Sequence, residues 1–121
     1  MTIKQSEIWL VNLDPTIGTE INKTRPCLVI GDDTIGKLRS KTVLPITAWS
    51  DVYGDVPWML KCTPTRDNHL KKNSAIDAFQ IRNLSTKRFI KKIGTIDKEL
   101  LFIVHSVVAQ TLSVRYRLII D

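Results

Sequence analysis

The hydrophobic positions of the chain fall into short runs that polar and turn-forming residues interrupt, a pattern typical of β-strands. These runs predict strands at residues 8–13, 27–30, 42–46, 58–62, 74–81 and 89–93. Pro45 lies inside the third run. Because proline donates no backbone hydrogen bond, we expect a sheet edge or a bulge at this position.

The spacing of the apolar residues changes after the sixth run. Over residues 100–112 they recur three and four positions apart, as on one face of a helix. Asp97 is a suitable N-cap, and Glu99 places negative charge near the helix N-terminus. Residues 114–118 alternate again and predict a short terminal strand. Short strands followed by one helix predict a mainly β fold, a small barrel-like sheet with a C-terminal α-helix, within a single domain that spans residues 1–121.

The composition is that of an ordinary globular domain. The 121 residues have a mass of 13.8 kDa, and 43% of them are hydrophobic and 25% charged. This excludes a disordered chain. Cys27 and Cys62 each lie in an apolar run, and we expect free buried thiols. No signal peptide is visible, and no run approaches the ~20 apolar residues of a membrane span, so we expect a cytoplasmic protein without a membrane segment.

The chain is basic, with 18 Lys and Arg against 12 Asp and Glu, a net charge of +6 and an isoelectric point near 9.6. No acidic residue lies between Ala78 and Ile96, and a second basic run extends from Lys61 to Lys72. A small basic domain is a candidate for binding nucleic acid. Two solvent-exposed basic faces without a binding role would explain this charge equally well. Local sequence motifs are therefore needed to distinguish the two interpretations.

Several local patterns are more specific than the charge. In chain order they are Asp14-Pro15 followed by Gly18 and Glu20, Arg25-Pro26 at the start of an apolar strand, Leu44-Pro45-Ile46-Thr47-Ala48, and Gln80-Ile81-Arg82 followed by Lys87-Arg88-Phe89. Together they resemble the MazF/PemK family of toxin endoribonucleases. The resemblance extends over residues 6–112.

The resemblance implies a compact SH3-like barrel of the MazF/PemK/CcdB type with a C-terminal helix, working as a homodimer. It implies the toxin component of a type II toxin–antitoxin system, which cuts single-stranded RNA, mostly mRNA, at short sequences. It further implies that the enzyme needs no metal and no other cofactor, and that an acidic antitoxin protein neutralises it. The Cys and His residues show no zinc-ligand spacing, in agreement with this expectation.

Two residues match the catalytic positions of the family, Arg25 its arginine and Thr47 its serine or threonine. A guanidinium contacts two phosphate oxygens at once and keeps its charge, and a hydroxyl donates to a phosphate oxygen. Pro26 biases the backbone of Arg25 toward an extended geometry. The alternative interpretations are a surface arginine at a strand end and an ordinary strand-end threonine.

The general base is the open part of this assignment. Many family members carry an acidic residue immediately before the position of Gln80, where this chain has Phe79. Asp77 lies two residues earlier and, on a strand, points to the same face as Phe79. Asp77 is therefore a candidate base, and an ion pair with a nearby Lys or Arg is the alternative. We expect neither His69, in a polar loop, nor His105, in the predicted helix, to be catalytic.

The resemblance also implies an RNA-binding surface. In the family, the loop that corresponds to residues 14–24 borders the RNA groove. The candidate RNA-binding residues are Asp14, Pro15, Gly18, Thr19, Glu20, Lys23, Gln80, Arg82, Lys87 and Arg88. Trp49 and Trp58 flank a polar loop and are either core anchors or an aromatic surface for bases or a partner peptide. Trp9 is expected in the core or in a dimer contact.

Three other functions stay open at this point. A gyrase poison of the CcdB type has the same fold, but such proteins end in Trp-Gly-Ile and this chain ends in Ile119-Ile120-Asp121. An inactive relative would bind RNA without cutting it, which Arg25 and Thr47 oppose and Phe79 favours. An SH3-like interaction module would bind an acidic peptide through the same basic surface.

Overall fold

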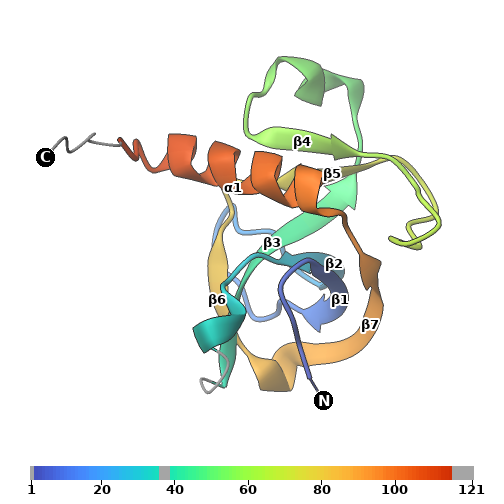
Figure 1. Cartoon of the computed structure of the whole chain (residues 1–121), viewed down its shortest axis with the longest axis vertical. Helices are drawn as coiled ribbons and strands as arrows, with labels where there is room; N and C mark the ends of the chain where they lie inside the picture. The colour runs from blue at the N-terminus through green and yellow to red at the C-terminus, as the bar shows by residue number, and fades with distance from the viewer. Residues whose placement is uncertain (1, 36–38, 116–121) are drawn as a thin grey trace, which may run out of the picture.

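A computed structural model describes residues 2–35 and 39–115 of the chain. Seven strands, three short 3₁₀ turns and one helix follow one another (Figure 1). In chain order they are β1 (Glu7–Asn12), β2 (Thr24–Val29), η1 (Asp33–Ile35), β3 (Ser40–Ala48), η2 (Asp51–Asp55), β4 (Met59–Cys62), β5 (Ser74–Asp77), β6 (Arg82–Ser85), η3 (Thr86–Arg88), β7 (Phe89–Thr95) and α1 (Lys98–Thr111).

The strands form one antiparallel sheet in the order β4-β5-β3-β2-β1-β7, with β6 also paired to β3. Strand β3 is the longest and lies inside the sheet. Residues 40–43 pair with β6, and residues 46–48 pair with β5. The expectation of a sheet edge at Pro45 is wrong, because Pro45 is fully buried and pairs with Cys27 of β2. Pro45 is accommodated where β3 changes partner from β6 to β5.

Alternation along the strands divides the core into two clusters, because successive side chains point to opposite faces. One face packs against α1 through Val104 and Val108, together with Ile8, Leu28, Leu44, Ile46 and Ile76. The other face is enclosed by the curl of the sheet and contains Trp9, Val11, Cys27, Val29, Val43, Leu84 and Phe89. In Figure 1, α1 crosses the molecule between β4 and the ring that contains β1, β2, β6 and β7. The mainly β, barrel-like fold with a C-terminal helix is confirmed.

The helix begins where the sequence predicts. The Asp97 side chain accepts a hydrogen bond from Leu100 N at 2.8 Å, which satisfies a free N–H of the first turn. Within the part of the chain that the structure describes, no helix is long and apolar enough to cross a membrane. Cys27 and Cys62 are free and buried, as expected. The terminal strand predicted over residues 114–118 lies largely outside the described residues.

The predicted strand over residues 74–81 is too long, because only its first half is a strand. Strand β5 ends at Asp77, a turn follows, and β6 begins at Arg82. The Asp77 carboxylate accepts the N–H of Phe79 at 3.0 Å, which closes this turn. The expectation that Asp77 and Phe79 share one face of a strand is therefore wrong: Asp77 is buried, whereas Phe79 is exposed.

Candidate active site

A pocket of about 400 Å³ brings together the three residues that the sequence nominates for catalysis. Arg25 reaches it from β2, Thr47 from β3 and Asp77 from β5. The strands supply this arrangement because β3 lies between β2 and β5 in the sheet. Residues far apart in the sequence therefore line one cavity, which combines a cation, a hydroxyl and a carboxyl group.

Arg25 is half-buried and keeps most of its donors available. Its Nε donates to the carbonyl oxygen of Asn22 at 3.0 Å, which directs the guanidinium along the edge of the pocket. Among residues 2–35 and 39–115, no carboxylate forms an ion pair with Arg25. Its neighbouring backbone is tied to the core, because Cys27 Sγ lies 3.8 Å from the Arg25 carbonyl oxygen. The charge can therefore act on an anion that enters the pocket.

Thr47 and Asp77 differ in their access to solvent. Thr47 is half-buried opposite Ala75, whereas Asp77 is buried opposite Met59. Burial raises the pKa of the Asp77 carboxyl, and hydrogen bonds from the backbone N–H groups of Phe79 and Gln80 partly oppose this rise. The predicted alternative, an ion pair of Asp77 with Lys or Arg, is not among the salt bridges of the described residues.

The loop of residues 13–23, which joins β1 to β2, is fastened by two of the predicted RNA-binding residues. Gln80 accepts a hydrogen bond from Ile21 N and donates one to the Thr19 carbonyl oxygen, both at 3.1 Å. Arg82 donates to the Ile21 carbonyl oxygen at 3.2 Å, and its other terminal nitrogen lies 3.7 Å from Glu20 Oε2. In this structure Gln80 and Arg82 therefore support the loop that borders the pocket.

Further hydrogen bonds hold the two ends of the same loop, where it leaves β1 and enters β2. Arg88 donates to the carbonyl oxygens of Asn12 and Asp14, and Asp14 Oδ1 accepts from Lys23 N at 3.1 Å. Lys23 has a positive φ of 69° and Gly18 one of 63°, so both take the left-handed conformation. The remaining candidates, Pro15, Gly18, Thr19, Glu20, Lys23 and Lys87, are exposed.

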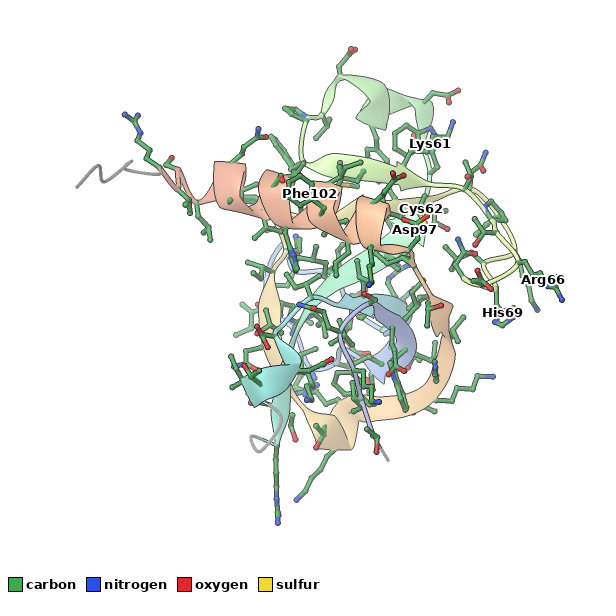
Figure 2. All side chains as sticks on the ribbon, in the orientation of Figure 1. Lys61, Cys62, Arg66, His69, Asp97 and Phe102 are labelled. Carbon is green, nitrogen blue, oxygen red and sulfur yellow. The ribbon has the colours of Figure 1, made fainter. Side chains whose placement is uncertain are left out.

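The two histidines lie outside the pocket, and Cys27 is unsuited to catalysis. His69 Nδ1 lies 2.7 Å from the Ile93 carbonyl oxygen and His105 Nε2 lies 2.9 Å from that of Ile30, and neither lines the pocket. Figure 2 shows His69 on the loop between β4 and β5, beside Arg66. Burial raises the pKa of Cys27 to about 12, although the Arg82 charge lowers it, so its thiol stays protonated.

Several pocket residues are not predicted by the sequence. Ile21 and Asn22 come from the loop, and Tyr53 and Val56 come from the segment around η2. Ile21 and Asn22 lie in the loop that the resemblance places beside the RNA groove, and the signal for Tyr53 and Val56 is their position between Trp49 and Trp58. Trp58 lines the pocket and is exposed, whereas Trp49 packs its ring edge-on against Tyr53 with centroids 5.7 Å apart.

Trp9, the third tryptophan, has a structural role. Trp9 is in the core, in edge contact with Phe89, and its indole Nε1 donates to Glu7 at 3.0 Å. Of the two expectations for Trp9, the core position is the one observed.

Comparison with known proteins places these features in a family. The model of the PemK-like, MazF-like toxins of type II toxin–antitoxin systems matches residues 4–112. Endoribonuclease MazF9 of Mycobacterium tuberculosis is 30% identical over 100 residues, covering 78% of this chain and 82% of that protein. Endoribonuclease EndoA of Bacillus subtilis is 28% identical over 102 residues, covering 84% and 86%.

Solved structures share the fold of this chain. The crystal structure of MazF from Deinococcus radiodurans aligns with a TM-score of 0.79 at 19% identity, covering 94% of this chain and 99% of that one. A MazE–MazF structure from the same organism aligns with a TM-score of 0.73 at 19% identity, covering 95% and 100%. A sequence match over this length, on a shared fold, shows that the chain belongs to the family of PemK-like, MazF-like toxins of type II toxin–antitoxin systems.

Proposed function

We propose that this chain is the toxin component of a type II toxin–antitoxin system, an endoribonuclease that cuts single-stranded RNA, chiefly mRNA in the cytoplasm. Relatives across most of its length carry the name endoribonuclease. The observation that carries the proposal is the single pocket lined by Arg25, Thr47 and Asp77. A cation, a hydroxyl donor and a proton acceptor are the groups that cleavage of RNA by its own hydroxyl requires.

The reaction begins with attack of a ribose 2′-oxygen on the adjacent phosphorus. A bond forms between O2′ and phosphorus, and the bond between phosphorus and O5′ of the next nucleotide breaks. A base of the pocket accepts the proton of the 2′-hydroxyl, and the departing O5′ takes a proton from solvent water. The products are a 2′,3′-cyclic phosphate, which can hydrolyse to a 3′-phosphate, and a free 5′-hydroxyl.

Each pocket residue has a role in this step. The Arg25 guanidinium neutralises the charge that develops on the phosphoryl oxygens, and the Thr47 hydroxyl donates to one of them. Asp77 is the candidate acceptor of the 2′-hydroxyl proton. A carboxylate with a raised pKa is a stronger base than an exposed aspartate, and this favours proton transfer.

The proposal includes two protein partners. A second copy of the chain forms a homodimer through an apolar, self-complementary interface, which extends the RNA groove across two subunits. An acidic antitoxin segment binds the basic surface of the toxin and competes with RNA. A structural relative has been solved as an endoribonuclease in complex with its cognate antitoxin, which supports the second partner.

The direct test incubates the purified protein with a pool of single-stranded RNA in the presence of EDTA. We expect cleavage at a short recurring sequence, an unchanged rate without divalent ions, and no cleavage of single-stranded DNA of the same sequence. DNA lacks the attacking 2′-hydroxyl. Intact RNA together with inhibition of DNA gyrase would instead support the gyrase-poison alternative.

A further inference from the structure

Two aromatic side chains stand exposed at the rim of the active-site pocket. Trp58 precedes β4 and Phe79 follows β5, and 40% and 59% of their respective surfaces are exposed. Their ring centroids lie 5.7 Å apart, with 46° between the ring planes. Trp58 also lines the pocket that contains Arg25 and Thr47. An aromatic surface therefore adjoins the cavity in which we place the scissile phosphate.

Paired strand ends hold both rings in position. Strands β4 and β5 are adjacent, with Met59 opposite Asp77. Ala78 N donates to the Trp58 carbonyl oxygen at 3.0 Å, and Phe79 N donates to Asp77 Oδ1 at 3.0 Å. Because neither ring is carried by a free loop, little conformational entropy has to be lost when a ligand covers the pair.

The surroundings of the pair favour a nucleotide over an apolar peptide. Single exposed apolar residues are ordinary, but this pair is continuous with a pocket that offers a free guanidinium and a hydroxyl. A nucleotide combines a phosphate with a flat ring, and it matches both surfaces at once. Every base has a π-face, so stacking on aromatic side chains requires no particular hydrogen-bonding edge.

We propose that Trp58 and Phe79 form a stacking site for an unpaired RNA base that neighbours the scissile phosphate. This inference rests on the proposed function, because it requires RNA in the pocket. Phe79 and Trp58 are positioning residues, which hold the substrate while Arg25 and Thr47 contact the phosphate.

The test measures binding to an RNA that cannot be cut. Cleavage by the full-length protein first maps the cut in the RNA pool, and an oligonucleotide of that sequence is made with a 2′-deoxyribose at the attacking position. Fluorescence anisotropy then gives the Kd. Phe79→Leu and Trp58→Leu remain apolar but lose the ring, and each should weaken binding about 5- to 150-fold, equivalent to the ~1–3 kcal/mol of one stacked base.

Phe102→Leu is the matched control. Phe102 is 73% exposed and lies on α1 (Figure 2), and it does not line this pocket. Its loss should leave the Kd unchanged. Phe79→Tyr keeps an aromatic face and should restore wild-type binding, while circular dichroism verifies that each variant is folded.

A series of oligonucleotides with one abasic ribose at each position in turn separates stacking from a purely structural role. Wild-type protein should lose affinity at one position near the cut. At that position, Phe79→Leu and Trp58→Leu should bind as wild type does, because the stacked base is already missing. If the two variants lose the same affinity on every oligonucleotide of the series, the stacking site is overturned.

The remaining outcomes distinguish this inference from the proposed function. If wild-type protein cleaves the RNA pool and both ring-deletion variants bind RNA like wild type, the stacking site is wrong and the endoribonuclease function stands. The rings are then available to a protein partner. If wild-type protein neither binds nor cleaves the pool, the proposed function itself is contradicted, and the stacking site with it.

Discussion

Arg25 and Asp77 line the same pocket but differ in their exposure to solvent. Arg25 is half-exposed on β2 and carries no ion-pair partner among the described residues, so its charge is free for a phosphate. Asp77 is buried at the end of β5, and burial raises the pKa of its carboxyl. The cation is therefore kept accessible, and the carboxylate is kept basic.

The Asp77→Asn variant tests whether this carboxylate is the base. The amide oxygen can still accept the Phe79 N–H and preserve the turn, but it cannot accept a proton. We expect the cleavage rate near neutral pH to fall about 10²-fold or more, within the range of general-base contributions. The wild-type rate should rise with pH through the raised pKa of Asp77, whereas the variant should lose this limb of its pH–rate profile.

Thermal unfolding at several pH values provides the control for this variant. The pKa of Asp77 is raised in the folded state, so folding binds its proton more tightly, and its contribution to stability is lost as pH rises through that pKa. Asp77→Asn should therefore be at least as stable as wild type at neutral pH. If the variant is stable and retains wild-type activity, another group or water must accept the proton of the 2′-hydroxyl.

At the residue scale, the sequence predicts the candidate site residues that lie in a recognisable motif. Arg25 and Thr47 are identified because the motifs around them resemble those of the MazF/PemK family. The position of Phe79 could not be predicted, because Ala78, Phe79 and Ile81 continue the apolar run of β5 into a turn. The Asp77 hydrogen bond to Phe79 N ends the strand, and only the folded chain reveals it.

At the scale of elements, the loop of residues 13–23 is organised by the segment that follows β5. Gln80 and Arg82 between them contact Thr19, Glu20 and Ile21 across about sixty positions of sequence. These contacts are long-range, so no local pattern predicts them. The side chains of Gln80 and Arg82, which lie outside the loop, therefore hold in place the part of the loop that borders the pocket.

Gln80→Ala should loosen this loop. Ile21 N loses its acceptor, and one hydrogen bond contributes about 1 kcal/mol, so the Ile21 amide should exchange its hydrogen about five-fold faster in the absence of RNA. Hydrogen–deuterium exchange of residues 19–22 measures this change. Lys87→Ala removes an exposed side chain from η3 and is the control. Equal protection in the two variants would contradict the support that we assign to Gln80.

Gly94 of β7 is needed for the approach of the β4–β5 loop. A Cβ at this position would run into the carbonyl oxygens of Asp67 and Asn68, and Thr95 N donates to the same Asp67 oxygen at 2.9 Å. Gly94→Ala should lower the free energy of unfolding by about 1–3 kcal/mol, the usual range for overpacking. Gly54→Ala, with open space around its Cβ, is the control for urea denaturation, and equal stability of the two would refute the close approach.

The elements themselves are predictable where their apolar residues form a clear pattern. Strand β1 is predicted because its apolar run from Ile8 to Val11 is continuous, and helix α1 is predicted because its apolar residues recur three and four positions apart. Strand β6 is missed because Leu84 is its only buried residue. The start of β2 is missed because Thr24, Arg25 and Pro26 come before its apolar run, although this segment pairs with β1.

At the scale of the whole molecule, we expect a second copy of the chain to complete the RNA groove. Light scattering at micromolar concentration should give twice the monomer mass of 13.8 kDa. An apolar interface should keep this mass unchanged at high salt, because screening weakens charge pairs and not apolar contacts. A monomeric mass together with full cleavage activity would show that one subunit contains the whole groove.

The central claim is that the pocket of Arg25, Thr47 and Asp77 cleaves RNA by 2′-hydroxyl attack. The most direct test is to cleave RNA in EDTA with wild-type and Arg25→Ala protein and to analyse the end groups of the products. We expect a 2′,3′-cyclic phosphate or 3′-phosphate on one fragment and a 5′-hydroxyl on the other. Arg25→Ala should remain folded and cut at least ~10²- to 10³-fold more slowly, as for a lost donor to a developing oxyanion. A 5′-phosphate on the downstream fragment, or wild-type cleavage by folded Arg25→Ala protein, would contradict the claim.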